Sequence, residues 1–310
     1  MSVLALSGGI GGAKLALGLY RVLPPGELTV VANTGDDFEH LGLAISPDID
    51  TLLYTLAGVD NPELGWGRRN ETWTFMAALE ALGGETWFKL GDGDLATHIE
   101  RTRRLAAGES LSQITDDFRH RLGISARLLP MSDERVRTRL RTDEGWLDFQ
   151  DYFVRLRASP VVREIAYPGA SHARANPDFF TALGGDDLEL VVICPSNPFL
   201  SIDPVLNLPR VRHALRACRA PVVAVSPIIG GKAIKGPTAK IMAELGLPVG
   251  AAAVARHYED ILDTFIAEES DASEVEDLGI PVRLARTLMS TIEDREDLAR
   301  VVLAVAGRGV

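Results

Sequence analysis

The chain has 310 residues, of which 46% are hydrophobic and 24% are charged, and it carries a net charge of −11. This composition is typical of a globular α/β protein with one large domain or two smaller ones, and it carries no signature of disorder. The acidic balance argues against a nucleic-acid partner, because binding a polyanion requires a basic face.

The two cysteines, Cys194 and Cys218, are too few for a disulfide framework or a zinc cluster, which favours a reducing, cytoplasmic location. We expect no membrane attachment, because no apolar run approaches the length of a membrane helix. We also expect no signal peptide, because the apolar N-terminal stretch is short, lacks a basic region and runs directly into glycines.

A glycine-rich loop follows the first predicted strand. Residues 3–6 form an apolar run that predicts a buried parallel strand, and residues 13–22 predict a helix. Glycines allow positive φ angles and let backbone N–H groups approach an anion at a helix N-terminus. Four of them lie between these elements: Gly8, Gly9, Gly11 and Gly12. The stretch predicts a binding site for a polyphosphate ester; the alternative is a tight turn with no ligand.

The loop matches neither established nucleotide-binding pattern. A dinucleotide fingerprint begun at Gly9 and Gly11 would need its third glycine where Lys14 stands. A P-loop would need serine or threonine after the lysine, where the chain has Leu15. The ordinary dinucleotide and Walker interpretations are therefore weakened.

A second buried strand is predicted over residues 28–33, and it ends in a turn that carries Asp36 and Asp37. Because ligands collect at the carboxyl ends of the strands in a doubly wound sheet, we expect this turn and the glycine loop to share one rim. In a nicotinamide enzyme, Asp36 would hold a ribose hydroxyl. The structural alternative is an Asx turn.

The next segment combines a helix start with two further acids. Ser46 is predicted as the N-cap and Pro47 as the first helical residue. Asp48 and Asp50 follow in the positive first turn, and residues two apart on a helix point in different directions. We expect Asp48 to stabilise the helix and Asp50 to face the pocket as a Mg²⁺ ligand, with a carboxylate of the preceding turn nearby.

An aromatic and basic run, GWGRRNETW, occupies residues 65–73 and suits a flat ring ligand. Trp66 and Trp73 are equally compatible with packing in a core or against a helix. Asn70 is predicted to cap a helix that runs through Leu82.

The following stretch predicts a turn at residues 90–94 and a helix over residues 95–107. Ser110 and Gln113 have the spacing of a capping box, which opens another helix. His98 has no histidine or cysteine partner at ligand spacing, so we expect it to bind no metal.

Arginine recurs at every second position from 135 to 141, which predicts a strand with one basic face. Acidic residues flank this stretch on both sides. We therefore interpret it as a solvated edge strand that is protected by charge.

Two later strands end in loops that suit an anion or a nucleoside. The strand predicted over residues 188–194 is followed by PSNP, and the strand over residues 222–225 by a loop with glycines, Lys232 and Lys235. If both loops lie on the same rim as the glycine loop, they belong to one site. For the second loop, the alternative is a lysine-bearing surface loop. A helix over residues 294–306 is predicted to close the chain.

Taken together, these motifs resemble those of the 2-phospho-L-lactate transferase family (CofD, called FbiA in actinobacteria) of coenzyme F-420 biosynthesis. The resemblance spans nearly the whole chain and rests on seven ordered motifs: SGGIGGAK, NTGDD, PDIDT, GWGRRNETW, LGDGDLATHIERT with LSQIT, CPSNP and SPIIGGKAIKG. It implies a Rossmann-like α/β fold with a mainly parallel sheet, helices on both faces and a smaller, mostly helical insertion. We expect one domain over residues 1–310 with an inserted subregion at about 60–180, and a homodimer.

The resemblance also implies Mg²⁺-dependent transfer of a phospho-acid group from a guanosine diphosphate-linked donor to the deazaflavin Fo, with release of GMP. We predict in-line attack of the Fo hydroxyl on the β-phosphorus of the donor, with a carboxylate of the Asp36/Asp50 group as the candidate base. Asp36 and Asp50 are the predicted catalytic and metal-holding residues. The later loops would hold the guanosine diphosphate end, and residues 66–98 would shape the deazaflavin pocket. The predicted substrate-binding residues are Gly8, Gly9, Gly11, Gly12, Asn33, Asp37, Asp48, Thr51, Trp66, Arg69, Asp94, His98, Ser196, Asn197, Ser226, Pro227, Ile229, Gly230, Gly231 and Lys232.

Two alternatives stay open on the sequence. A non-catalytic, nucleotide-sugar-binding regulator of the YvcK type would keep the glycine loop but have no Fo pocket, and the motifs between Trp66 and His98 speak against it. A nicotinamide dehydrogenase would use Gly9, Gly11 and Asp36, and the incomplete glycine fingerprint counts against it. The acid on the donor, whether lactyl, enolpyruvyl or glyceryl, is left open.

Overall fold

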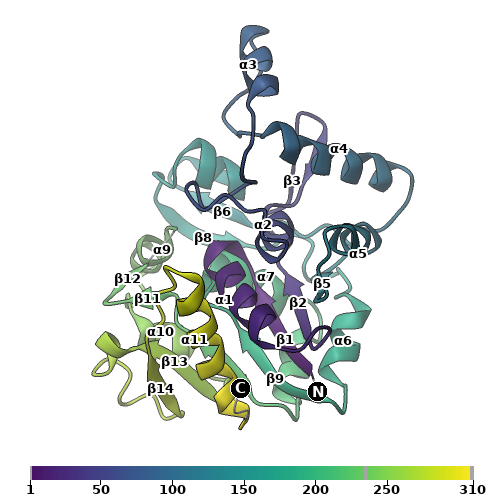
Figure 1. Ribbon diagram of the computed structural model, residues 1–310. Helices are drawn as coiled ribbons and strands as arrows, with labels where there is room; N and C mark the ends of the chain where they lie inside the picture. Colours follow the sequence, from purple (N-terminus) through teal and green to yellow (C-terminus); the bar gives the residue numbers. More distant parts are fainter. Residues whose placement is uncertain (1, 234–235, 308–310) are drawn as a thin grey trace.

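A computed structural model describes residues 2–233 and 236–307 of the chain. Its centre is a seven-stranded parallel sheet in the order β14-β13-β10-β9-β1-β2-β5 (Figure 1). The strands are β1 Ser2–Ser7, β2 Leu28–Ala32, β5 Arg127–Pro130, β9 Leu188–Ile193, β10 Val222–Val225, β13 Thr264–Glu268 and β14 Val282–Ala285. β1 lies between β9 and β2, which brings the segments after these three strands to one edge of the sheet.

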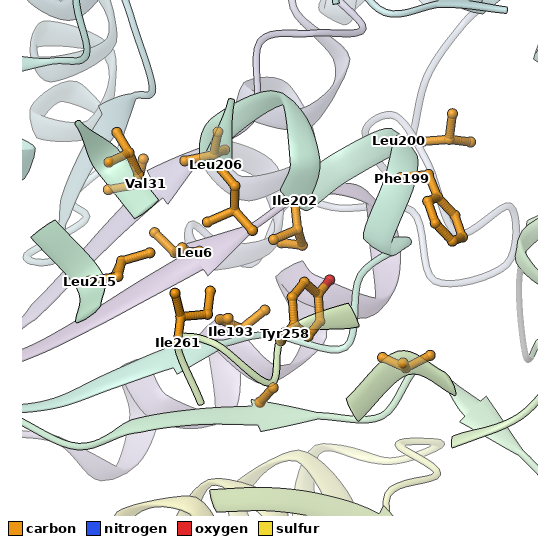
Figure 2. Packing of buried hydrophobic residues seen from close by; sticks show 14 of the residues in the cluster. Leu6, Val31, Ile193, Phe199, Leu200, Ile202, Leu206, Leu215, Tyr258 and Ile261 are labelled. Carbon is orange, nitrogen blue, oxygen red and sulfur yellow. The ribbon is translucent and has the colours of Figure 1, made fainter. Parts of the chain in front are cut away.

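Side chains of β1 alternate between the two faces of the sheet and enter two separate hydrophobic clusters. Val3 and Ala5 pack into one cluster, and Leu4 and Leu6 into the other. Figure 2 shows the second cluster, in which Leu6 lies among apolar side chains from neighbouring strands and from the helices on that face. Burial on both faces explains why the strands read as continuous apolar runs.

Helices cover both faces, which confirms the predicted Rossmann-like fold. One face carries α1 Gly9–Val22, α2 Pro47–Leu56, α5 Leu111–Arg121 and α11 Ile292–Leu303. The other carries α6 Pro177–Leu183, α7 Asp203–Leu206, α8 Val211–Arg216, α9 Thr238–Glu244, α10 Ala251–His257 and the π-helical turn η2 Pro198–Ile202. The 3-10 turns η3 Glu269–Asp271 and η4 Ala304–Ala306 follow β13 and α11. The predicted closing helix is thus α11 followed by η4.

The segment between α2 and α6 supplies elements outside the main sheet. α3 Thr74–Ala81 projects from the body of the molecule beyond α4 Asp92–Ala106 (Figure 1). The hairpin of β3 Phe38–His40 and β4 Leu43–Ile45 packs with them in a small apolar cluster. A three-stranded antiparallel sheet follows, built from β6 Arg139–Thr142, β7 Gly145–Asp148 and β8 Val162–Ala166, with the π-helical turn η1 Asp151–Arg155. Because β5 of the same segment belongs to the main sheet, the predicted division into a core and an inserted subregion stays a prediction.

Two predicted helix starts differ from the observed ones. α3 begins at Thr74 rather than after Asn70, because the Asp92 carboxylate accepts hydrogen bonds from the backbone N–H groups of Thr74 (3.1 Å) and Phe75 (3.0 Å). α4 begins at Asp92, ahead of the predicted start at residue 95, with Gly91 at its N-cap. Both differences arise from contacts between elements that lie apart in the sequence.

Two predicted caps have different outcomes. The capping box at Ser110 and Gln113 is confirmed, with each residue's side chain accepting from the other's backbone N–H. Ser46 does lie at the N-cap of α2, but its side chain makes no capping hydrogen bond. Its hydroxyl instead donates to Asp37 Oδ2 at 2.9 Å, which ties the helix start to the turn after β2.

The prediction of a solvated basic edge strand was wrong about the edge. β6 begins only at Arg139 and lies between β7 and β8. Its arginines are neutralised by acids of the neighbouring strands, at 2.8 Å from Arg139 to Asp148 and 2.8 Å from Arg141 to Glu164. Sequence alternation showed the basic face but not the carboxylates opposite it.

Within the described residues, no helix combines the length and the apolar character needed to cross a bilayer. The predicted cytoplasmic location stays a prediction.

Candidate functional site

A cavity of about 910 Å³ opens at the carboxyl ends of β1, β2, β9 and β10. It brings together the glycine loop, the turn after β2, the start of α2, the start of α4 and both later loops, which are distant in the sequence. The predicted site residues in its wall are Gly8, Gly9, Gly11, Asn33, Asp36, Asp48, Asp50, Thr51, Trp66, Asp94, His98, Ser196, Asn197, Ser226, Pro227 and Ile229. Outside the wall lie Gly12, Asp37, Arg69, Gly230, Gly231 and Lys232, whose binding roles stay predictions.

The glycine loop joins β1 to α1, as predicted, and its glycines serve different purposes. Gly9 has a φ of 65°, which favours glycine, but a Cβ there would meet no atom within 4 Å. Gly11 lies in the ordinary helical region, and a Cβ there would overlap the Pro195 carbonyl oxygen. The loop therefore needs Gly9 for its turn and Gly11 for the close approach of the 195–198 segment.

The Asp48 carboxylate accepts a hydrogen bond from one backbone N–H group of the glycine loop. Its Oδ1 accepts from the Gly9 N–H at 2.5 Å, and its Oδ2 accepts from Asn33 Nδ2 at 2.9 Å. The same Asn33 amide lies 3.4 Å from Asp36 Oδ1, so Asn33 holds the two carboxylates beside each other. Asp48 was predicted to stabilise its own helix and, from the resemblance, to bind substrate; its side chain also reaches across to the loop after β1.

The carboxylates at the end of β2 are buried and repel one another. The pKa of Asp36 is raised well above its ordinary value by burial and then by the charges of Asp48 and Asp37. Burial raises the pKa of Asp37 to about 7, against the opposing effects of Arg137 and of the hydrogen bond from Ser46. Burial also raises the pKa of Asp48 to about 6, against the hydrogen bonds from Asn33 and Gly9. An added cation would relieve this repulsion.

The donor set fits Mg²⁺, which prefers carboxylate oxygens and takes few of them. Asp36 and Asp48 lie beside each other in the cavity wall, and Asp37 Oδ1 is buried without a hydrogen-bond partner among the described residues. Within the same residues, no group of three or more histidine, cysteine or acidic side chains is arranged to hold a metal ion. A bound Mg²⁺ would therefore complete its coordination with substrate phosphate oxygens and water.

Asp50 also faces the cavity, but its carboxylate is held by Arg101 of α4. Arg101 is 1% exposed and donates from both terminal nitrogens, with Nη1 at 3.0 Å from Asp50 Oδ2. His98 Nδ1 lies 3.6 Å from the same oxygen, and His98 Nε2 lies 3.2 Å from Asp94 Oδ2. The Tyr54 hydroxyl completes the chain by donating to Asp94 Oδ1 at 2.6 Å.

Arg101 is a site residue that sequence reasoning missed. It follows Asp94 and His98 at a spacing of seven and three residues, so all three share one face of α4. Three buried polar residues on one helix face were the available signal, although their partner on α2 was not predictable from it. The role of Asp50 as a metal ligand stays a prediction, and a metal ion bound there would share the Asp50 carboxylate with Arg101.

Aromatic side chains surround the opening of the cavity. Trp66 is 40% exposed, lines the cavity and meets Trp73 edge to face at 6.2 Å between ring centroids. The wall also contains Trp87 and Phe88. Phe149 and Phe153 belong to it as well, and their rings stack with 5.4 Å between the centroids. This second pair was not predicted from the sequence, because its two rings reach the cavity wall only when residues 149–155 pack beside it in the folded chain.

The two later loops are held by their own polar side chains. Ser196 Oγ accepts from the Gly8 N–H at 3.2 Å, and Asn197 Oδ1 caps η2 by accepting from the N–H groups of Phe199 and Leu200. Ser226 forms a turn with the backbone of Ile228. The hairpin of β11 Ile228–Ile229 and β12 Lys232–Ala233 then carries the chain away from the wall. The other lysine predicted in this loop, Lys235, lies outside the described residues.

Comparison with known proteins gives one family and one fold. A family model described as 2-phospho-L-lactate transferase CofD matches residues 3–288. A phosphoenolpyruvate transferase from Kitasatospora aureofaciens is 42% identical over 316 residues, covering 99% of this chain and 98% of its own. A 2-phospho-L-lactate transferase from Methanosarcina mazei is 40% identical over 304 residues, covering 97% of this chain and 99% of its own. The crystal structure of a member of the UPF0052 family from Bacillus halodurans has a TM-score of 0.65 at 13% identity, covering 97% of this chain and 98% of that one, which is a likeness of fold alone.

Proposed function

Because the chain belongs to the CofD 2-phospho-L-lactate transferase family and is a transferase of coenzyme F-420 biosynthesis, we propose that it moves a phospho-acid group from a guanosine diphosphate-linked donor to the deazaflavin Fo and releases GMP. The group is 2-phospholactyl, phosphoenolpyruvyl or a related acid. One observation carries the proposal: a single cavity joins a glycine-rich helix start, a group of buried carboxylates and an aromatic opening.

Each part of the cavity suits one part of this pair of substrates. The backbone at the start of α1 suits the donor phosphates, and the 195–198 and 226–229 loops suit the guanosine end. The aromatic opening around Trp66 and Phe153 suits the flat deazaflavin ring. A nucleotide-binding regulator would need no such acceptor opening, so this feature favours the transferase.

In the proposed reaction, the Fo hydroxyl attacks the β-phosphorus of the donor in line with the departing GMP. A new P–O bond forms to Fo, and the bond from the β-phosphorus to the oxygen bridging it to the α-phosphate breaks, with its electrons leaving on GMP. The hydroxyl proton passes to a carboxylate of the Asp36, Asp48 and Asp50 group. Burial raises the pKa of Asp48 to about 6, which suits it to accept a proton near neutral pH, and the pKa of Asp36 is raised in the same direction by burial.

Asp36 and Asp50 would hold Mg²⁺ at this edge of the sheet, and Asp48 lies beside Asp36. When bound, the ion would neutralise charge on the phosphate oxygens and so favour transfer. Asn33 keeps two of these carboxylates together, and Arg101 fixes the orientation of the third. The chain itself therefore organises the acidic group before any ligand arrives.

The direct test is incubation of the protein with Fo, Mg²⁺ and each guanosine diphosphate-linked acid, followed by mass spectrometry. We expect a phospho-acid ester of Fo and one equivalent of GMP with at least one donor. Fo binding, followed by its fluorescence, separates this function from that of a regulator. Absence of both Fo binding and product with all three donors would refute the proposal.

We also propose a homodimer, in line with the family. α3 supports this, because only Met76 of its eight residues is buried and Leu82, directly after it, is 86% exposed. An apolar helix that projects into solvent is typical of a surface covered by a second copy.

A further inference from the structure

A small second pocket of about 130 Å³ adjoins the cavity at the first turns of α1. Its walls come from α1, α2, α11 and the loop that follows α2. Ile10, Lys14 and Thr51 line both spaces, so the pocket opens beside the part of the cavity assigned to the donor phosphates. At roughly 30 Å³ per water, its volume suits a group of a few heavy atoms.

The charges in this pocket favour an anion. Lys14 and Arg295 supply two cationic side chains, against the single carboxylate of Asp60. Lys14 is held at the wall shared with the cavity, where its Nζ donates to the Met289 carbonyl at 2.6 Å. Hydroxyl groups of Thr51, Thr55 and Ser290 also belong to the lining.

Arg295 is the residue that marks the pocket as a binding site. Its Nε is buried and has no hydrogen-bond partner among residues 2–233 and 236–307. Burial lowers the pKa of the guanidinium, and the charge of Asp60 only partly offsets this effect. Arg295 lines this polar pocket, and a desolvated donor costs stability unless a partner satisfies it; a carboxylate is the natural partner of a guanidinium.

We propose that this pocket binds the carboxylate of the acid carried by the donor, with Arg295 as its principal partner and Lys14 at its entrance. The inference rests on the proposed function. Lactyl, enolpyruvyl and glyceryl groups all carry a carboxylate within two carbons of the phosphoester oxygen. The pocket would therefore recognise the shared carboxylate and fix the acid while its phosphate is transferred.

The test compares the wild type with Arg295→Gln, which removes the charge and keeps a polar side chain. Arg300→Gln is the matched control, because Arg300 lies on the same helix and pairs at the surface with Glu296 and Asp297. Arg295→Lys retains a cation and should recover part of any loss. Thermal unfolding verifies that each variant is folded.

Three ligands are measured by calorimetry: GDP, the enolpyruvyl donor linked to GDP, and the same donor with a carboxamide in place of the carboxylate. We expect Arg295→Gln to weaken the affinity for the carboxylate donor about tenfold and to leave the affinities for GDP and the carboxamide donor unchanged. Arg300→Gln should change none of the three affinities. An equal loss for all three ligands, or no loss for the carboxylate donor, would overturn the assignment.

Phosphoenolpyruvate alone, followed through the fluorescence of Trp66 and Trp73, separates this inference from the proposed function. Binding that Arg295→Gln weakens and Arg300→Gln preserves supports the pocket even if no transfer to Fo occurs. Transfer to Fo with unchanged donor affinity and KM in Arg295→Gln refutes the pocket and leaves the function standing.

Discussion

At the scale of single residues, the pair of Asp50 and Arg101 couples stability to the candidate chemistry. Both side chains are buried, at 5% and 1% exposure. Removing one partner leaves an uncompensated buried charge, which costs about 3–5 kcal/mol. A substitution of Asp50 therefore affects the stability of the fold as well as any role of its carboxylate in turnover.

We predict that Asp50→Ala loses both turnover and about 3 kcal/mol of unfolding free energy. The double variant Asp50→Ala/Arg101→Met should regain most of the stability, because no unpaired charge remains, and stay inactive. Urea denaturation and turnover in Mg²⁺ measure the two effects separately. Near-normal turnover of the folded double variant would disprove a role for the Asp50 carboxylate.

At the scale of elements, the turn from β1 into α1 assigns different tasks to neighbouring glycines. A side chain at Gly11 would act through steric overlap rather than backbone strain, because the backbone at Gly11 is not in the left-handed region and the obstacle is the Pro195 carbonyl.

We therefore predict that Gly11→Ala displaces the 195–198 segment and weakens the affinity for GDP about tenfold. Gly11→Val should lose more of this affinity. Gly9→Ala should leave GDP affinity near normal and cost about 1–2 kcal/mol of stability from its positive φ. Calorimetry with GDP and chemical denaturation give the two readouts. Equal GDP affinities for Gly11→Ala and the wild type would remove the 195–198 segment from the nucleotide site.

The link between α8 and the segment that follows α10 has a pH dependence of its own. Hydrogen bonds from Arg212, and then from Arg216, lower the pKa of Asp260 to about 2. A lowered carboxyl pKa adds stability that is present above the unfolded value near 4 and is lost as the pH falls towards 2.

We predict that Asp260→Asn destabilises the protein by about 1 kcal/mol at pH 7, a figure reduced for solvent screening of this partly exposed group. The difference from the wild type should shrink between pH 4 and pH 2. Urea denaturation at pH 7, 4 and 3 provides the comparison. A constant difference across this range would mean that the ion pairs do not cause the effect.

At the scale of the whole molecule, the sequence predicted what local patterns encode and missed what distant segments create. The apolar runs of β1, β2, β9 and β10 gave the sheet, and the polar residues after them gave the rim. The salt bridge between Asp50 and Arg101 joins residues 51 positions apart, so no periodicity could reveal it. The same reason explains why the aromatic pair of Phe149 and Phe153 was missed.

The projecting α3 leads to a prediction about assembly. Light scattering should report a dimer for the wild type, and Leu82→Glu should shift it towards a monomer, because a charge would enter the apolar surface. Glu80→Lys also changes the charge at an exposed position of α3. It tests whether any change of charge on this helix shifts the dimer towards a monomer as Leu82→Glu does. A wild type that is monomeric at micromolar concentration would contradict the proposed homodimer.

The position of β1 between β2 and β9 also affects how the chain folds. Leu4 pairs with Thr29 on one side and with Val191 on the other, so one edge of β1 gains its partner early in synthesis and the other much later. Pro195 and Ser196, which contact the glycine loop, directly follow β9, so these contacts form only after β9 has been synthesised. During synthesis, a nascent chain that ends before β9 exposes an unpaired edge and lacks a finished nucleotide loop, so folding and competence to bind are completed together by one long-range pairing.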